Sequence, residues 1–138
     1  MIRSSNPERN WLAAAETALD TAALVDATRV TPQTGQADTM IRAGYLALRS
    51  IADFYRIEQE VPADKHDTLS VSRPKFDELL DDLERRGIEL ERDRDLIWRD
   101  YAGWRMNYDN AISGLSDLVG FVPSHWEQVG VARETSIE

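Results

Sequence analysis

Arg105 and Asp109 are the charged residues whose types and spacing are best suited to form a defined site. They are one helical turn apart, and each directly follows an aromatic residue, Trp104 or Tyr108. One interpretation is a buried or interfacial guanidinium, stacked on an aromatic ring and held by the carboxylate. The other is an exposed helix pair that contributes less than about 1 kcal/mol. A catalytic role would require a nucleophile or a polar pocket, and the sequence identifies neither.

The two histidines do not predict a metal site. His66 lies among Asp64, Lys65 and Asp67, and His125 precedes Trp126. A helical metal site would place a second ligand one turn away, but the positions three residues before each histidine are Ala and Val. We therefore expect both histidines to be structural or exposed, with no metal bound.

The segment 76–84 carries a run of carboxylates that resembles a cation site: Asp77, Glu78, Asp81, Asp82 and Glu84. This run lacks the alternating ligands and the central glycine of a calcium loop. The acids alternate with apolar residues at helical spacing, so we expect them to form the solvated face of an amphipathic helix. The chain also lacks a phosphate-binding glycine loop and the common hydrolase motifs, and we predict no cofactor.

Composition limits the possible partners. The chain has 138 residues, and its 16 basic and 25 acidic residues give a net charge of −9. This charge opposes non-specific binding to nucleic acid. There is no cysteine, no apolar run approaches the roughly 20 residues of a membrane helix, and the first ten residues are polar. We expect a single soluble, cytoplasmic domain spanning residues 1–138.

The segment 93–119 predicts one long helix with an aromatic side. The residues at steps of three and four are Ile97, Tyr101, Trp104, Tyr108, Ala111, Ile112, Leu115 and Leu118. So much aromatic surface must face either a core or a partner. The residues with candidate interaction or structural roles are Trp98, Tyr101, Trp104, Arg105, Tyr108 and Asp109.

Three further helices precede this one. An alanine-rich helix is expected to begin at Asn6 and to stop before Pro32, a second covers about 36–59, and a third is capped by Ser72 and ended by Gly87. Residues 69–71 and 88–90 are candidates for two short extended segments that pair with each other. We expect a mobile loop at 60–68 and frayed ends at 1–5 and 129–138. The pattern predicts an all-α, four-helix bundle-like domain.

Two blocks resemble a known family. They are residues 43–55 (AGYLALRSIADFY) and residues 70–109, which begin SVSRPKFD and end WRDYAGWRMNYD. Together they resemble the soluble C-terminal region of bacterial, mainly actinobacterial, ion-channel-like membrane proteins. The likeness covers most of residues 11–122. It implies a cytoplasmic module attached to the membrane portion of a parent protein. The chain has no potassium-filter motif, so the resemblance does not imply channel activity.

The function expected from these observations is a non-enzymatic assembly or regulatory module that forms a homo-oligomer. The alanine-rich first helix and the tryptophans and tyrosines would supply the contact. A second interpretation is a sensor whose helices enclose a small apolar ligand near Trp104 and Tyr108, in a cavity of about 300 Å³ or more. A third is an enzyme that uses Arg105, Asp109, Asp100 or His66 in one cleft.

Overall fold

The computed structural model describes residues 7–57 and 69–119, and within them the chain is all-helical. The helices are α1 (Pro7–Thr28), α2 (Gln36–Phe54), α3 (Arg73–Arg85), α4 (Arg94–Arg105) and α5 (Asp109–Val119). The predicted all-α, bundle-like fold is confirmed, with five described helices in place of four. No helix within these two ranges is both long and apolar enough to span a bilayer.

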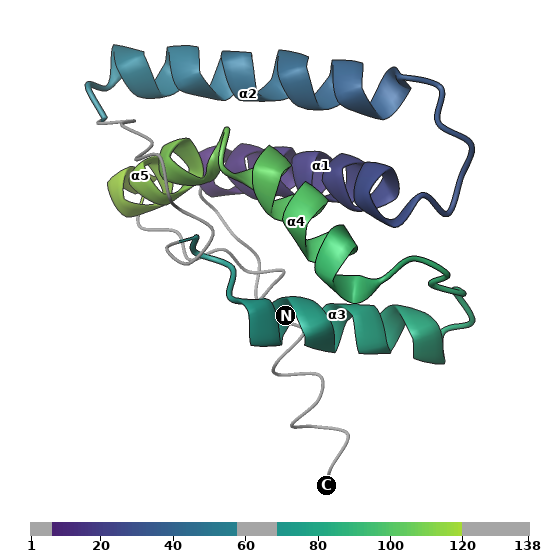
Figure 1. Ribbon diagram of the computed structural model, residues 1–138. Helices are drawn as coiled ribbons and strands as arrows, with labels where there is room; N and C mark the ends of the chain where they lie inside the picture. Colours follow the sequence, from purple (N-terminus) through teal and green to yellow (C-terminus); the bar gives the residue numbers. More distant parts are fainter. Residues whose placement is uncertain (1–6, 58–68, 120–138) are drawn as a thin grey trace, which may run out of the picture.

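The helices stack in three layers (Figure 1). The first helix, α1, occupies the middle and packs against α2, α4 and α5, while α3 contacts α4 on the opposite side from α2. This arrangement places α2 at one outer edge of the molecule and α3 at the other. The hydrophobic core therefore forms around α1, with Leu12 and Leu19 fully or almost fully buried.

The central position of α1 changes the interpretation of its alanines. Ala22, Ala23 and Ala27 are buried within the chain itself. Small side chains allow neighbouring helices to approach closely, and these three alanines serve that purpose inside the fold. They are not available for contact with another chain, so this part of the expected subunit contact on α1 is wrong.

The second helix turns only part of its apolar surface inward. Ile41, Leu48 and Ala52 are buried, whereas Met40 and Phe54 are exposed. A Cβ atom added to Gly44 would lie 2.3 Å from Cδ2 of Leu19, so glycine permits the close approach of α1 to α2. The helix ends at Phe54, earlier than the predicted Gln59, because Arg56 adopts a left-handed backbone conformation (φ 59°).

The local signals around α3 predict its ends correctly. The Ser72 side chain accepts a hydrogen bond from the backbone N–H of Lys75, Pro74 lies in the first turn, and Gly87 follows the helix with φ 95°.

The predicted pairing of two short extended segments, 69–71 and 88–90, is wrong. Residues 69–71 form bends and residues 88–90 are irregular, and neither segment forms a β-bridge within the described chain. The backbone of Ile88 instead donates to Leu83 at the end of α3.

The predicted long helix over 93–119 is interrupted at residues 106–108. The N–H groups of Asn107 and Tyr108 donate to carbonyls three residues earlier instead of four, which tightens the turn. The Asn107 amide donates to the carbonyls of Gly103 and Trp104 at the end of α4. Arg49 of α2 donates to both the backbone carbonyl and the side-chain oxygen of Asn107, at 2.9 and 3.1 Å. This contact from a distant helix stabilises the break.

The inward side of the interrupted helix is nevertheless as predicted. Six of its eight residues are buried, namely Ile97, Tyr101, Tyr108, Ala111, Ile112 and Leu115. Trp104 is partly buried, and Leu118 near the end of α5 is exposed. The break changes the helix axis and leaves the apolar residues of both halves facing the core.

The carboxylates of 77–84 lie mainly at the surface, as expected, and they are extensively paired. Arg94 of α4 donates to Asp81 and Glu84 of α3, and Arg73 of α3 contacts Asp77 and Asp95. These pairs connect α3 to α4 across a small interface. The histidines at 66 and 125, the predicted loop at 60–68 and the predicted frayed ends at 1–5 and 129–138 lie outside the described residues.

Two glycines give a test of helix packing. Gly44→Ala should be less stable than Gly103→Ala by about 2 kcal/mol, because the new methyl group at position 44 forces a shift of the buried Leu19. At position 103 a Cβ atom meets no atom within 4 Å, so alanine should stabilise α4 by about 0.5–1 kcal/mol. Urea unfolding of both variants measures the difference. Equal stabilities would contradict the close α1–α2 contact.

Candidate functional site

Arg105, at the last residue of α4, is completely buried, and its guanidinium binds three carboxylates. The Nε atom donates to Asp109 at 2.7 Å, Nη1 to both oxygens of Asp20 at 2.8 and 2.9 Å, and Nη2 to Glu16 at 3.0 Å. All three carboxylates are themselves buried. Of the two interpretations of the Arg105–Asp109 pair, the buried guanidinium is correct.

Two further polar groups complete this arrangement, which we call the Arg105 cluster (Arg105, Glu16, Asp20, Ser70, Tyr108 and Asp109). Ser70 donates its hydroxyl to Asp109 at 2.6 Å and accepts a hydrogen bond from Arg105 at 3.1 Å. Tyr108 donates to Asp20 at 2.6 Å, and its ring centroid lies 5.3 Å from the guanidinium carbon. The cluster therefore joins α1, the segment before α3, the end of α4 and the start of α5.

The ionisation of the cluster follows from its burial and its charges. Burial by itself would lower the pKa of Arg105, but the charges of Asp20 and Asp109 outweigh it and raise this pKa well above its usual value. Burial, followed by the charge of Asp20, raises the pKa of Tyr101 and of Tyr108 well above the usual range. The guanidinium thus stays charged and both phenols stay protonated at neutral pH.

The helical repeat explains how these residues meet. Glu16 and Asp20 are four residues apart on α1, on the same side as Leu12 and Leu19. Arg105 and Asp109 are also four apart, on either side of the break. Sequence reasoning found the second pair and missed Glu16, Asp20 and Ser70. The available signal was the presence of two acids on the apolar side of an otherwise alanine-rich helix.

The chemistry open to the Arg105 cluster is limited by its enclosure. Arg105 and Glu16 have no exposed surface, so a dissolved substrate has no access to them in this conformation. Within residues 7–57 and 69–119, no group of three or more histidine or carboxylate side chains is arranged to hold a metal ion. The geometry is that of an ionic connection between helices, in which each buried charge is stabilised by opposite charge and hydrogen bonds.

The other predicted aromatic residues have separate surroundings. Tyr101 is buried and stacks on Phe76 of α3 with ring centroids 4.7 Å apart, and the ring of the partly buried Trp98 lies 5.2 Å from that of Phe76. Trp104 donates its ring N–H to Asp26 of α1 at 2.7 Å. Its ring also lies 5.2 Å from the guanidinium carbon of Arg42. These contacts attach α4 to α3 on one side and to α1 and α2 on the other.

Asp100 does not join the Arg105 cluster. Its carboxylate accepts hydrogen bonds from Arg92 at 2.8 Å and from Arg99 at 3.2 Å. Arg92 also donates to the carbonyl of Ala27 near the end of α1. Although burial raises the pKa of Asp100, the hydrogen bonds from the two arginines outweigh burial and lower it below its usual value. The four residues considered for an enzyme therefore do not all meet, and His66 is outside the described chain.

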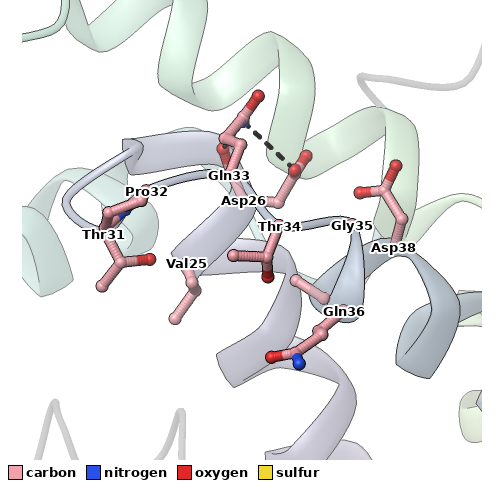
Figure 2. A pocket seen from close by; sticks show the side chains of 10 residues that line it. Val25, Asp26, Thr31, Pro32, Gln33, Thr34, Gly35, Gln36 and Asp38 are labelled. Carbon is pink, nitrogen blue, oxygen red and sulfur yellow. Dashed lines mark hydrogen bonds between the residues drawn. The ribbon is translucent and has the colours of Figure 1, made fainter.

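Two surface hollows lie near Asp26. The first, of 290 Å³, is formed by the connection between α1 and α2, where Gln33 donates to the Asp26 carboxylate at 3.4 Å (Figure 2). At its edge, burial and the charge of Asp26 raise the pKa of Asp38. The second hollow, of 420 Å³, borders Trp104 and includes Arg42, Arg99 and Asp100. Tyr108 does not line it, and its charged lining differs from the expected apolar ligand cavity.

Comparison with known proteins does not add to this description. The chain matches no protein-family model, no curated protein and no solved structure. The geometry and the sequence pattern are therefore the basis for a function.

Removal of the central cation should be strongly destabilising. Arg105→Met should lower the free energy of unfolding by about 3–5 kcal/mol, because three buried carboxylates lose their counter-charge. The matched control is Arg99→Met, which removes an exposed arginine and should cost less than about 1 kcal/mol. Chemical denaturation at neutral pH measures both, and equal small losses would contradict the burial of a paired Arg105.

The Asp100 carboxylate should contribute stability that depends on pH. Because its pKa is lower in the folded state, its contribution is present above the usual value of 3.8 and is lost as the pH falls through the folded-state pKa. Asp100→Asn should therefore be less stable than the parent chain at pH 6, and the two curves should converge below pH 4 on urea unfolding. A constant difference across this range would show that the charge of Asp100 is not responsible.

Proposed function

We propose that this chain is a non-enzymatic, homo-oligomeric assembly or regulatory module, and that it forms the cytoplasmic part of a channel-like membrane protein. The observation that carries the proposal is the exposed apolar surface on the outer side of α2. Phe54 is 80% exposed and Leu46 is 57% exposed, and both are on a well-formed helix. Apolar groups gathered on one exposed face are typical of a protein–protein contact.

The interior supports the assembly role over a chemical one. The most unusual polar group, Arg105, is enclosed and fully committed to contacts between helices. Asp109 belongs to the same enclosed cluster, whereas Asp100 is engaged by the partly buried Arg92 and the exposed Arg99. Such an interior favours a rigid helical unit that presents its surface to partners.

The membrane context of the proposal comes from the family resemblance of residues 43–55 and 70–109. A parent protein would supply the membrane-spanning portion, and this module would lie at the inner face of the plasma membrane. If the parent forms a pore, its subunits would surround an axis, and self-association of the module would follow that symmetry. The net charge of −9 supports a protein partner over nucleic acid.

A small-ligand sensor is less well supported. Tyr108 has no exposed surface, and the hollow beside Trp104 is open and lined by both acidic and basic side chains. Apolar ligands are usually held in concave sites with mostly hydrophobic walls. The assembly proposal accounts better for the exposed residues of α2.

Self-association is testable with the purified chain. Size-exclusion chromatography with light scattering should give a mass of at least twice the 15.7 kDa of one chain at high concentration, with dissociation on dilution. The expected cause is burial of the exposed apolar residues of α2. A mass of 15.7 kDa at every concentration would contradict the proposal.

A further inference from the structure

The exposed side of α2 carries an uncharged stripe with coiled-coil spacing. Its members, which we call the α2 outer stripe, are Met40, Ala43, Ala47, Ser50 and Phe54. They follow one another at steps of three, four, three and four, which is the spacing of the contact positions in a coiled coil. All five are exposed, so their partner is not another helix of the described chain.

This stripe differs from an ordinary solvated helix face. Exposed positions in the last turns of α3 include Asp81, Glu84 and Arg85, and the exposed Arg86 follows the helix directly. The α2 outer stripe has no charged member and ends in two large apolar residues, Met40 at 47% and Phe54 at 80% exposure. In a chain with 30% charged residues, an uncharged stripe across nearly the full length of a helix indicates a contact surface.

The sizes of the side chains indicate what covers the stripe. Small residues, Ala43, Ala47 and Ser50, occupy its middle and allow the backbone of another helix to approach closely. The large residues stand at opposite ends, each seven residues from Ala47. A two-fold axis at Ala47 would place Met40 of one copy beside Phe54 of the other, at both ends of the contact. The surface is therefore complementary to itself in the antiparallel direction.

We infer that two copies of the chain associate through antiparallel pairing of their α2 outer stripes, with Ala47 at the two-fold axis. This inference rests on the proposed self-association, and it specifies which surface of each copy pairs and in which direction the two helices run. Leu46, which is 57% exposed, would then lie close to Leu46 of the second copy and extend the apolar contact. Burial of these side chains would drive the association.

The charges beside the α2 outer stripe favour antiparallel pairing. Arg42 and Asp53 are both exposed and, at 11 residues or about three turns apart, lie on the same flank of α2. In the antiparallel pair, Arg42 lies opposite Asp53 of the second copy, and the same pair forms again across the axis. Parallel pairing would instead put this flank of the two copies on opposite sides of the contact, so Arg42 and Asp53 would form no pair across it.

The same charges oppose a lipid surface as the occupant. Asp38 and Asp53 accompany the arginines on α2, and the whole chain has a net charge of −9. Both would weaken attraction to anionic headgroups. In addition, Arg49 is engaged with Asn107. A second copy of the chain is therefore the better match to this face.

Disulfide trapping tests the surface directly, because the chain contains no native cysteine. Ala47→Cys should form a covalent dimer under mild oxidation, since a residue at a close two-fold contact meets its own copy within disulfide range. The matched control is Ala14→Cys, which also replaces an exposed helical alanine but lies on α1. Ala14→Cys should remain largely monomeric on a non-reducing gel.

The direction of pairing has its own readout. Met40→Cys and Phe54→Cys should each crosslink poorly alone and efficiently when mixed, because each meets the other across the axis. Efficient crosslinking of Met40→Cys with itself would indicate a parallel pair and would overturn the inference. Arg42→Asp and Asp53→Arg should each weaken association, and the double exchange should restore it.

Disruption of the stripe separates this inference from the proposed function. Ala47→Arg should raise the dissociation constant by at least about tenfold while the thermal midpoint at low concentration stays near that of the parent chain. If the parent chain is oligomeric but Ala47→Cys crosslinks no better than Ala14→Cys, the α2 pairing is wrong and the assembly role stands. If the parent chain is monomeric, both are wrong. Phe54-dependent binding to phosphatidylserine vesicles without self-association would also overturn the inference.

Discussion

The contact of Arg105 with three buried carboxylates is the interaction on which the arrangement of the helices depends. The interacting residues come from three helices: Glu16 and Asp20 from α1, Asp109 from α5, and the arginine from the end of α4. An apolar core tolerates small rotations of its helices, whereas paired buried charges require defined distances and directions. The cluster thus fixes how α4 and α5 sit on α1, at the cost of removing four charges from water.

This fixed interior also supports the outer surface of α2, on which the proposed assembly depends. Because α1 packs against α2 through Leu19 and Gly44, the exposed residues of α2 are held at a constant orientation. A stripe on a rigid helix can pair with a copy of itself without a cost for ordering a loop. The proposed dimer would therefore need no change inside either subunit.

The sequence predicted those features that depend on neighbouring residues. Ser72, Pro74 and Gly87 mark the ends of α3 through local backbone chemistry, and the apolar repeat marks the inner side of α4 and α5. The break at 106–108 was missed because Arg49, 58 residues away, binds Asn107 only in the folded chain. Glu16 and Asp20 were missed for the same reason, since their partner Arg105 is 89 and 85 residues away.

The long separation between Arg105 and its α1 partners has a consequence for how the chain is made. During synthesis α1 leaves the ribosome first, with Glu16 and Asp20 exposed to water and without their cation. Arg105 follows Glu16 by 89 residues and Asp20 by 85, so the guanidinium is made well after the α1–α2 hairpin is complete. Closure of the core is therefore coupled to completion of the C-terminal half, so the N-terminal hairpin is not an independent folding unit during translation.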